Sequence, residues 1–104
     1  MKLKGNNVWP AALEPAVLLA LFIADQIWNE LGQELVVTSL NDSTHSETSL
    51  HYIGNAADLR TRYFTDEIKE KAAAMLKEKL NKHYDVVVEK THIHLEYQPK
   101  NPHS

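Results

Sequence analysis

The sequence predicts one α+β domain in which helices pack on one face of a small antiparallel sheet, while the open face carries a functional site. Three observations support this fold class. The chain has 104 residues, enough for one hydrophobic core and too few for two. Two segments have the apolar spacing of amphipathic helices, and two others have the β-branched runs of strands. We therefore expect residues 1–104 to form a single domain with an irregular tail from about residue 99.

The first predicted helix spans residues 15–31. Its apolar side chains recur every three or four residues, and Leu18 and Phe22 widen the apolar face. Pro15 suits the first helical turn, and Gly32 suits the position that follows the last turn. The predicted buried face contains Leu13, Val17, Leu21, Ala24, Trp28 and Leu31.

The remaining elements follow from similar patterns. The β-branched run at residues 35–38 predicts a buried strand, and the polar residues 41–48 predict a loop. Thr65 is the predicted N-cap of a second helix, which has acidic residues in its first turn and lysines near its end. Residues 84–97 predict either one long strand or two strands joined by a bend at residues 89–91. The buried stripe of the second helix is predicted to contain Ile68, Ala72, Met75, Leu76 and Leu80.

Composition argues against several functional classes. The net charge of −3 and the lack of a Lys and Arg cluster argue against nucleic-acid binding. The chain has no Cys, so a bound metal would need His, Asp or Glu ligands. Lys2 and Lys4 before the apolar residues 16–24 imitate a secretory signal, but the helical spacing continues to Leu31, which predicts no signal peptide. These nine apolar residues are also far fewer than the ~20 that span a membrane.

Two short segments contain residues typical of metal chemistry. Residues two apart on a strand share a face, so His92 and His94 would present two imidazoles together. His51 and Asp58 are separated by Gly54 and two alanines, which allow a tight turn. Two imidazoles and one carboxylate are a frequent ligand set for catalytic zinc. The histidine pair alone is equally compatible with an ordinary surface strand.

The full pattern resembles a known family. The chain contains Ser49-x-His51-x-x-Gly54-x-Ala56-x-Asp58 and, after a gap of about 35 residues with a predicted helix, His92-x-His94. This pattern resembles the signature of zinc-dependent cell-wall peptidases, which include D-alanyl-D-alanine carboxypeptidases and phage L-alanyl-D-glutamate endolysins. The zinc domain of hedgehog proteins shares their fold. The resemblance covers residues from about 36 to 97 and implies a zinc site on the open face of the sheet.

The resemblance also implies a role for each matching residue. His51, Asp58 and His94 would be the zinc ligands. His92 would lie beside the metal and stabilise the negative charge of the tetrahedral intermediate.

Other residues are candidates for substrate contacts. Ser49 would orient the substrate, or it would serve only as a loop-capping hydroxyl. His45 lies in the polar loop before the motif, where it would contact substrate or remain a solvent-exposed histidine. Arg60 and Arg62 would attract the carboxylates of a stem peptide, or they are ordinary surface charges.

One position departs from the family pattern. In the family a carboxylate usually stands three residues before the last zinc histidine and acts as the general base, but here that residue is Thr91. A hydroxyl cannot act as that base near neutral pH. Glu89 is the candidate replacement if the chain bends, and a shifted register would pair Glu89 as base with His92 as ligand. Glu96 is a further candidate for a carboxylate near the site.

We therefore expect a monomeric zinc peptidase that cleaves peptidoglycan stem peptides, of the D,D-carboxypeptidase or L-alanyl-D-glutamate endopeptidase type. The predicted lack of a signal peptide suits a phage or prophage endolysin that stays in the cytoplasm until its release to the cell wall. It also suits a hydrolase of small cytoplasmic peptides. Thr91 favours an alternative function, a catalytically weak or inactive zinc domain that binds cell-wall peptide or a protein partner.

Overall fold

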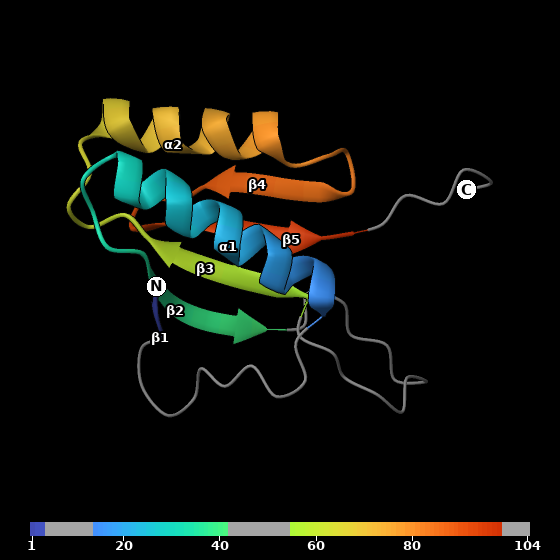
Figure 1. Cartoon of the computed structure of the whole chain (residues 1–104). Helices are drawn as coiled ribbons and strands as arrows, with labels where there is room; N and C mark the ends of the chain where they lie inside the picture. The colour runs from blue at the N-terminus through green and yellow to red at the C-terminus, as the bar shows by residue number, and fades with distance from the viewer. Residues whose placement is uncertain (4–13, 42–54, 99–104) are drawn as a thin grey trace.

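The computed structural model describes residues 1–3, 14–41 and 55–98, which form a five-stranded sheet and two helices (Figure 1). The strand order is β1-β2-β3-β5-β4, and both helices pack on the same face of the sheet. The predicted α+β class with a one-sided helix layer is confirmed. The elements are β1 (Lys2–Leu3), α1 (Pro15–Glu30), β2 (Val36–Asn41), β3 (Ala56–Arg60), α2 (Asp66–Lys79), β4 (Tyr84–Val88) and β5 (His92–Tyr97).

Helix α1 matches the predicted helix to within one residue. Pro15 begins the helix, and Gly32 follows it with a φ of +81°, a conformation that glycine adopts without steric cost. Trp28 is 1% exposed, and its indole Nε1–H donates a hydrogen bond to the Arg60 carbonyl at 3.2 Å. The indole also packs against the Phe64 ring, with centroids 5.4 Å apart. The predicted buried residues Val17, Leu21, Ala24 and Trp28 lie in the core.

Helix α2 begins as predicted. The Thr65 hydroxyl accepts a hydrogen bond from the Ile68 backbone N–H at 3.2 Å, which is the N-cap interaction. Ala72 and Leu76 are buried against the sheet, as expected, and Leu80 is buried just beyond the last turn.

Strands at the middle and edge of the sheet were not predicted. The sequence predicts a tight turn before Asp58, but residues 56–58 begin β3, which pairs antiparallel with both β2 and β5. The two-residue β1 pairs parallel with β2, so the sheet is mixed and not purely antiparallel. Strand β2 also continues to Asn41, the first residue of the predicted loop.

Strands β4 and β5 form a hairpin. Val88 is the register partner of Ile93, and the Glu89 N–H donates to the His92 carbonyl at 2.8 Å. Residues 84–97 are therefore two strands joined by a turn at Lys90 and Thr91, which confirms the second of the two predicted alternatives.

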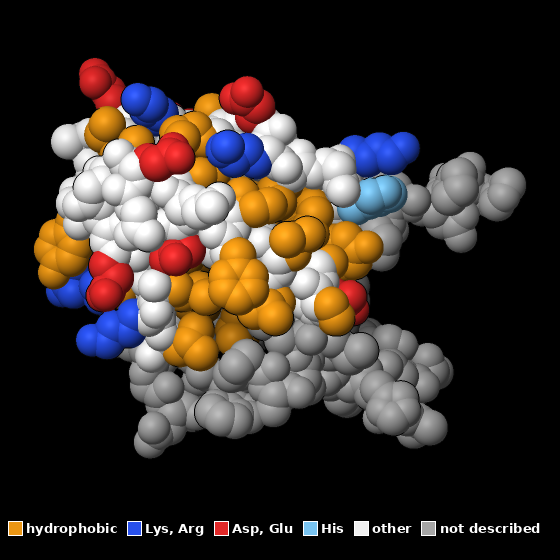
Figure 2. Space-filling model, in the orientation of Figure 1, with side chains coloured by type: hydrophobic (Ala, Val, Ile, Leu, Met, Phe, Trp, Pro, Cys, Tyr) orange, Lys and Arg blue, Asp and Glu red, His pale blue; other side chains and the backbone are white. Residues whose placement is uncertain are grey.

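The helix side of the molecule carries exposed apolar side chains. Figure 2 shows hydrophobic groups gathered on this side, and α1 contributes Leu18, Leu19 and Phe22, which are 40%, 58% and 55% exposed. In the segments that the structure describes, neither helix is long and apolar enough to cross a membrane.

Candidate functional site

The candidate site lies on the sheet face that the helices leave uncovered. Alternation along β3 and β5 sends successive side chains to opposite faces. Apolar residues point to the helices, and polar residues point to the open face. The first group contains Ala57, Leu59, Ile93 and Leu95, and the second contains Asp58, Arg60, His92, His94 and Glu96.

Asp58 and His94 are direct register partners on β3 and β5. The Asp58 Oδ1 atom lies 2.8 Å from His94 Nδ1 and 3.6 Å from His92 Nε2. The antiparallel pairing thus brings together three of the residues that the sequence selected. His51, Ser49 and His45 lie outside the described residues, so their positions relative to this group remain predictions.

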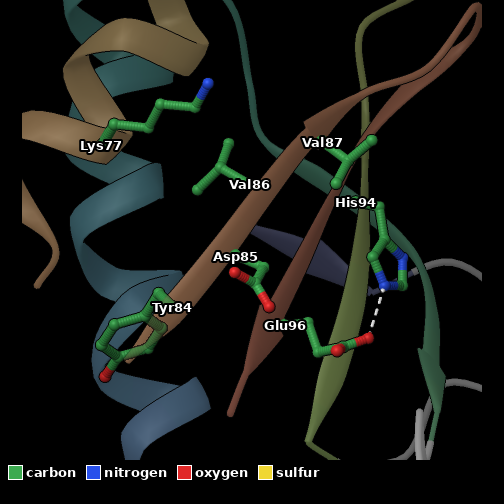
Figure 3. Close-up of a pocket in the computed structure, with 7 residues that line it drawn as sticks. All are labelled: Lys77, Tyr84, Asp85, Val86, Val87, His94 and Glu96. Carbon is green, nitrogen blue, oxygen red and sulfur yellow. Dashed lines mark hydrogen bonds and ion pairs between the residues drawn. The ribbon is translucent and has the colours of Figure 1, made fainter. Parts of the chain in front are cut away.

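Glu96 fixes the other side of the His94 ring. Its Oε1 atom is 3.1 Å from His94 Nε2, the contact drawn as a dashed line in Figure 3. The second oxygen of Glu96 accepts a hydrogen bond from the Gln98 side-chain amide. His94 is therefore held between two carboxylates, one at each ring nitrogen.

These contacts shift the pKa of the His94 imidazole. Its partial burial acts to lower the pKa of the imidazole, because burial disfavours the charged form. The hydrogen bonds and negative charges of Asp58 and Glu96 act in the opposite direction and prevail, so the pKa of His94 lies above its ordinary value in the metal-free protein.

Thr91 contacts the neighbouring histidine. Its Oγ1 atom lies 3.2 Å from His92 Nδ1, so the hydroxyl fixes one nitrogen of this ring while the other faces Asp58. Thr91 occupies the position where the family has its carboxylate, and here it orients a histidine.

Glu89 follows β4 at the start of the hairpin turn and is exposed. Val87 is opposite His94, and the Glu89 N–H to His92 carbonyl bond continues this register. Positions 87 and 89 share one face of the strand by alternation. Because of the turn, position 89 lies on the same face of the sheet as His94. In one continuous strand, positions 89 and 94 would lie on opposite faces.

A hollow of about 390 Å³ lies beside His94 on the side away from Asp58. Its open-face wall contains Asp85, Val87 and Glu96, and Lys77 of α2 also lines it (Figure 3). Strand β4 is the last strand in the order of the described sheet. The site is therefore accessible from this edge.

The described residues provide part of a candidate zinc site. Taken alone, residues 1–3, 14–41 and 55–98 contain no group of three His, Asp or Glu side chains placed to hold a metal ion. They do contain an imidazole nitrogen and a carboxylate oxygen 2.8 Å apart. Zinc binds such atoms at about 2.0–2.2 Å, so both could coordinate one ion after a small separation. A carboxylate on the second nitrogen, as Glu96 provides, is the usual support of a metal-binding histidine.

Comparison with known proteins found no matching family model, no matching curated protein and no matching solved structure. Sequence reasoning left Glu96 without an assigned contact, although its spacing of two from His94 was a usable signal. The sequence also offers no reason to expect that Lys69 of α2 and Lys90 of the hairpin turn line one cavity, because no linear pattern connects these two segments.

Proposed function

We propose that this chain is a zinc-dependent peptidase that hydrolyses a bond in peptidoglycan stem peptides, with His51, Asp58 and His94 as the zinc ligands. The observation that carries the proposal is the Asp58–His94 pair. These residues are 36 positions apart in sequence, yet their ligand-type atoms lie 2.8 Å apart on the open face. His51, the third proposed ligand, belongs to the same sequence signature as Asp58.

The protein side chains prepare the His94 nitrogen for a metal. When the Nε2–H group of a neutral His94 donates its hydrogen bond to Glu96, the lone pair of Nδ1 faces Asp58. Asp58 adds a negative charge that favours a divalent cation. Zinc at this position would lower the pKa of a bound water to ~7 and polarise the scissile carbonyl.

His92 would stabilise developing negative charge. If its Nδ1 accepts the Thr91 hydroxyl proton, the neutral ring carries its own proton on Nε2, which faces the Asp58 side of the site. That N–H can donate to the oxyanion of the tetrahedral intermediate. Thr91 would then act by selecting this tautomer.

Glu89 is the proposed general base. The hairpin turn brings position 89 opposite His92, and a glutamate side chain is long enough to reach toward His94 from there. Its carboxylate would accept a proton from the attacking water and return it to the leaving amine.

Zinc binding tests the ligand assignment. The purified chain should bind about one zinc ion, and His51→Ala, Asp58→Ala or His94→Ala should remove most of the affinity because water must replace a protein ligand. His92→Ala should keep the metal and lower the rate of amino-group release from purified peptidoglycan. His83→Ala, which changes a histidine preceding β4, is the matched control. If all three ligand variants keep stoichiometric zinc after dialysis against a mild chelator, the assignment is wrong. Zinc loss in His92→Ala would instead favour the shifted register.

A second candidate function is a zinc domain that binds cell-wall peptide or a protein partner with little or no catalysis. Thr91 at the usual position of the base favours it, because its hydroxyl is occupied with His92. The two functions differ in one assay. A binding domain would sediment with peptidoglycan and release no new amino groups, whereas a peptidase would release them. In either case we propose a monomer, and for the peptidase a phage or prophage endolysin that reaches the wall after release from the cytoplasm.

A further inference from the structure

A second cavity, of about 540 Å³, lies where β3 ends and α2 begins. Its walls come from the end of β3 and the loop after it, from the first turns of α2 and from the hairpin turn between β4 and β5. These segments are distant in sequence, and neither proposed function uses the cavity.

Positive charge dominates this cavity. It is lined by Arg60, Arg62, Lys69 and Lys90 and by one carboxylate, Asp66. The whole chain carries a net charge of −3, so four cations at one place run against its overall balance. Among ion pairs of the described residues, only Lys69 has a carboxylate within reach, with Nζ 3.7 Å from the fully exposed Asp66 Oδ1.

Both arginines lie against the same aromatic ring, and neither forms an ion pair with a carboxylate of the described residues. Their guanidinium carbons lie 5.6 Å and 5.4 Å from the centre of the same Tyr63 ring. The ring positions both groups, but its weak attraction does not neutralise two full charges. Charges of one sign that line a single cavity raise the free energy of the folded chain, and a bound anion would lower that cost.

The interior of the cavity offers two further donors. The Lys69 side chain is only 12% exposed, and its Nζ donates to the Lys90 carbonyl at 3.0 Å, which fixes the ammonium group against the hairpin turn. Thr61 is 4% exposed, and its Oγ1 makes no hydrogen bond within the described segments. A buried hydroxyl without a partner is unfavourable, and because Thr61 lines the cavity, a ligand oxygen that reaches this hydroxyl would satisfy it.

The cavity adjoins the candidate site. Arg60 is the register partner of His92 and lies on the open face next to Asp58. Thr91 lines the cavity and also contacts His92 Nδ1. A ligand that crosses the Asp58–His94 pair would therefore extend toward the cations.

We propose that this cavity binds an oxyanion, and that on the peptidase it is the subsite for a carboxylate of the peptide substrate near the scissile bond. The second part rests on the proposed function, while anion binding itself does not. Arginine and lysine suit this ligand because they donate charge-assisted hydrogen bonds to carboxylate or phosphate oxygens.

Binding to the metal-free full chain tests the cavity without catalysis. The probes are acetyl-D-alanine, its uncharged amide and inorganic phosphate, each followed by backbone amide NMR shifts. Acetyl-D-alanine should shift the amides of Thr61, Arg62 and Thr91, and its amide should not. Arg62→Gln, at an exposed rim position, and Lys69→Met should each weaken binding about tenfold, as expected for a lost charge-assisted contact. Lys82→Gln, far from the cavity, should not change it.

The outcomes separate the two proposals. Equal shifts with the amide, or equal binding by Arg62→Gln and Lys69→Met, would overturn the oxyanion site. Tighter binding of phosphate than of acetyl-D-alanine would assign the cavity to free phosphate and overturn the substrate subsite. With zinc present, a loss of hydrolysis of at least about tenfold when the substrate carboxylate is amidated supports the subsite. Anion binding without any hydrolysis would retain the cavity and reject the peptidase.

Discussion

The two faces of the same strands differ completely in chemistry. On β5, Ile93 and Leu95 are fully buried against the helices, while His92 and His94 keep about 30% of their side chains exposed on the other face. On β3, Leu59 is fully buried and its neighbour Asp58 contacts both histidines. One residue of displacement along a strand thus separates the core from the site.

This difference shows how the fold divides stability from function. Burial of apolar area by α1 and α2 stabilises the covered face, and each buried aliphatic side chain contributes ~1.5–3 kcal/mol. The open face contributes little burial, so its positions can carry carboxylates and imidazoles without weakening the core. The antiparallel pairing of β3 with β5 holds these groups in register.

The largest effect of an open-face change should be on activity. Glu89→Gln should lower the rate of peptidoglycan hydrolysis by ~10²–10⁴, the usual loss for a general base, with zinc content and unfolding midpoint unchanged. Thr91→Asp should do little or interfere, because Thr91 contacts His92. Glu78→Gln, an exposed carboxylate on α2, is the matched control. Amino-group release from peptidoglycan measures all three.

The opposite result would favour the binding domain. If Glu89→Gln is nearly silent and Thr91→Asp raises the rate, the chain is a weakened relative of an active peptidase whose base has been lost.

The next largest effect should be on stability, and it should differ between two adjacent residues of β5. Ile93→Ala should destabilise the protein by ~2–5 kcal/mol, because it removes a fully buried side chain and leaves a cavity in the core. His92→Ala should cost less than about 1 kcal/mol, because the ring is partly solvated. Urea unfolding of the metal-free variants measures both. Similar losses for the two variants would contradict the division between the faces.

Elements with local signals were predictable from sequence. The helix at 15–31, Gly32 after it and the Thr65 N-cap depend on neighbouring residues, and the structure reproduces all three. Strand alternation grouped His92 with His94, whereas Asp58 was linked to them only by the family resemblance; its direct contact with both rings follows from the β3–β5 pairing.

Elements with nonlocal causes were not predictable. Strand β3 begins with two alanines, which have low strand propensity, and it is a strand because β2 and β5 flank it on both sides. Its alternation of Ala57 and Leu59 with Asp58 and Arg60 was a signal too short to use alone. The cationic cavity has no linear signal, because it combines the end of β3, the start of α2 and the hairpin turn.

The smallest effect concerns a polar contact on the covered side. The Tyr84 hydroxyl donates to the Ala16 carbonyl at 2.7 Å and so links β4 to the first turn of α1. Burial raises the pKa of Tyr84, and the nearby Tyr97 and Glu14 raise it further, because each disfavours the phenolate. The folded protein therefore holds this proton more tightly than the unfolded chain, whose tyrosine pKa is about 10.

Tyr84→Phe should lower the free energy of unfolding by ~0.5–1.5 kcal/mol at neutral pH, since it removes one hydrogen bond. The stabilising contribution of a raised pKa is complete below pH ~10 and disappears as the pH rises through the pKa of the folded state. The difference in stability between the native protein and Tyr84→Phe should therefore shrink above pH ~10. Tyr63→Phe, which removes a hydroxyl from a residue that is 64% exposed, should show no such difference. A constant difference from pH 7 to pH 11 in urea unfolding would show that the Tyr84 hydroxyl does not hold its proton through this contact.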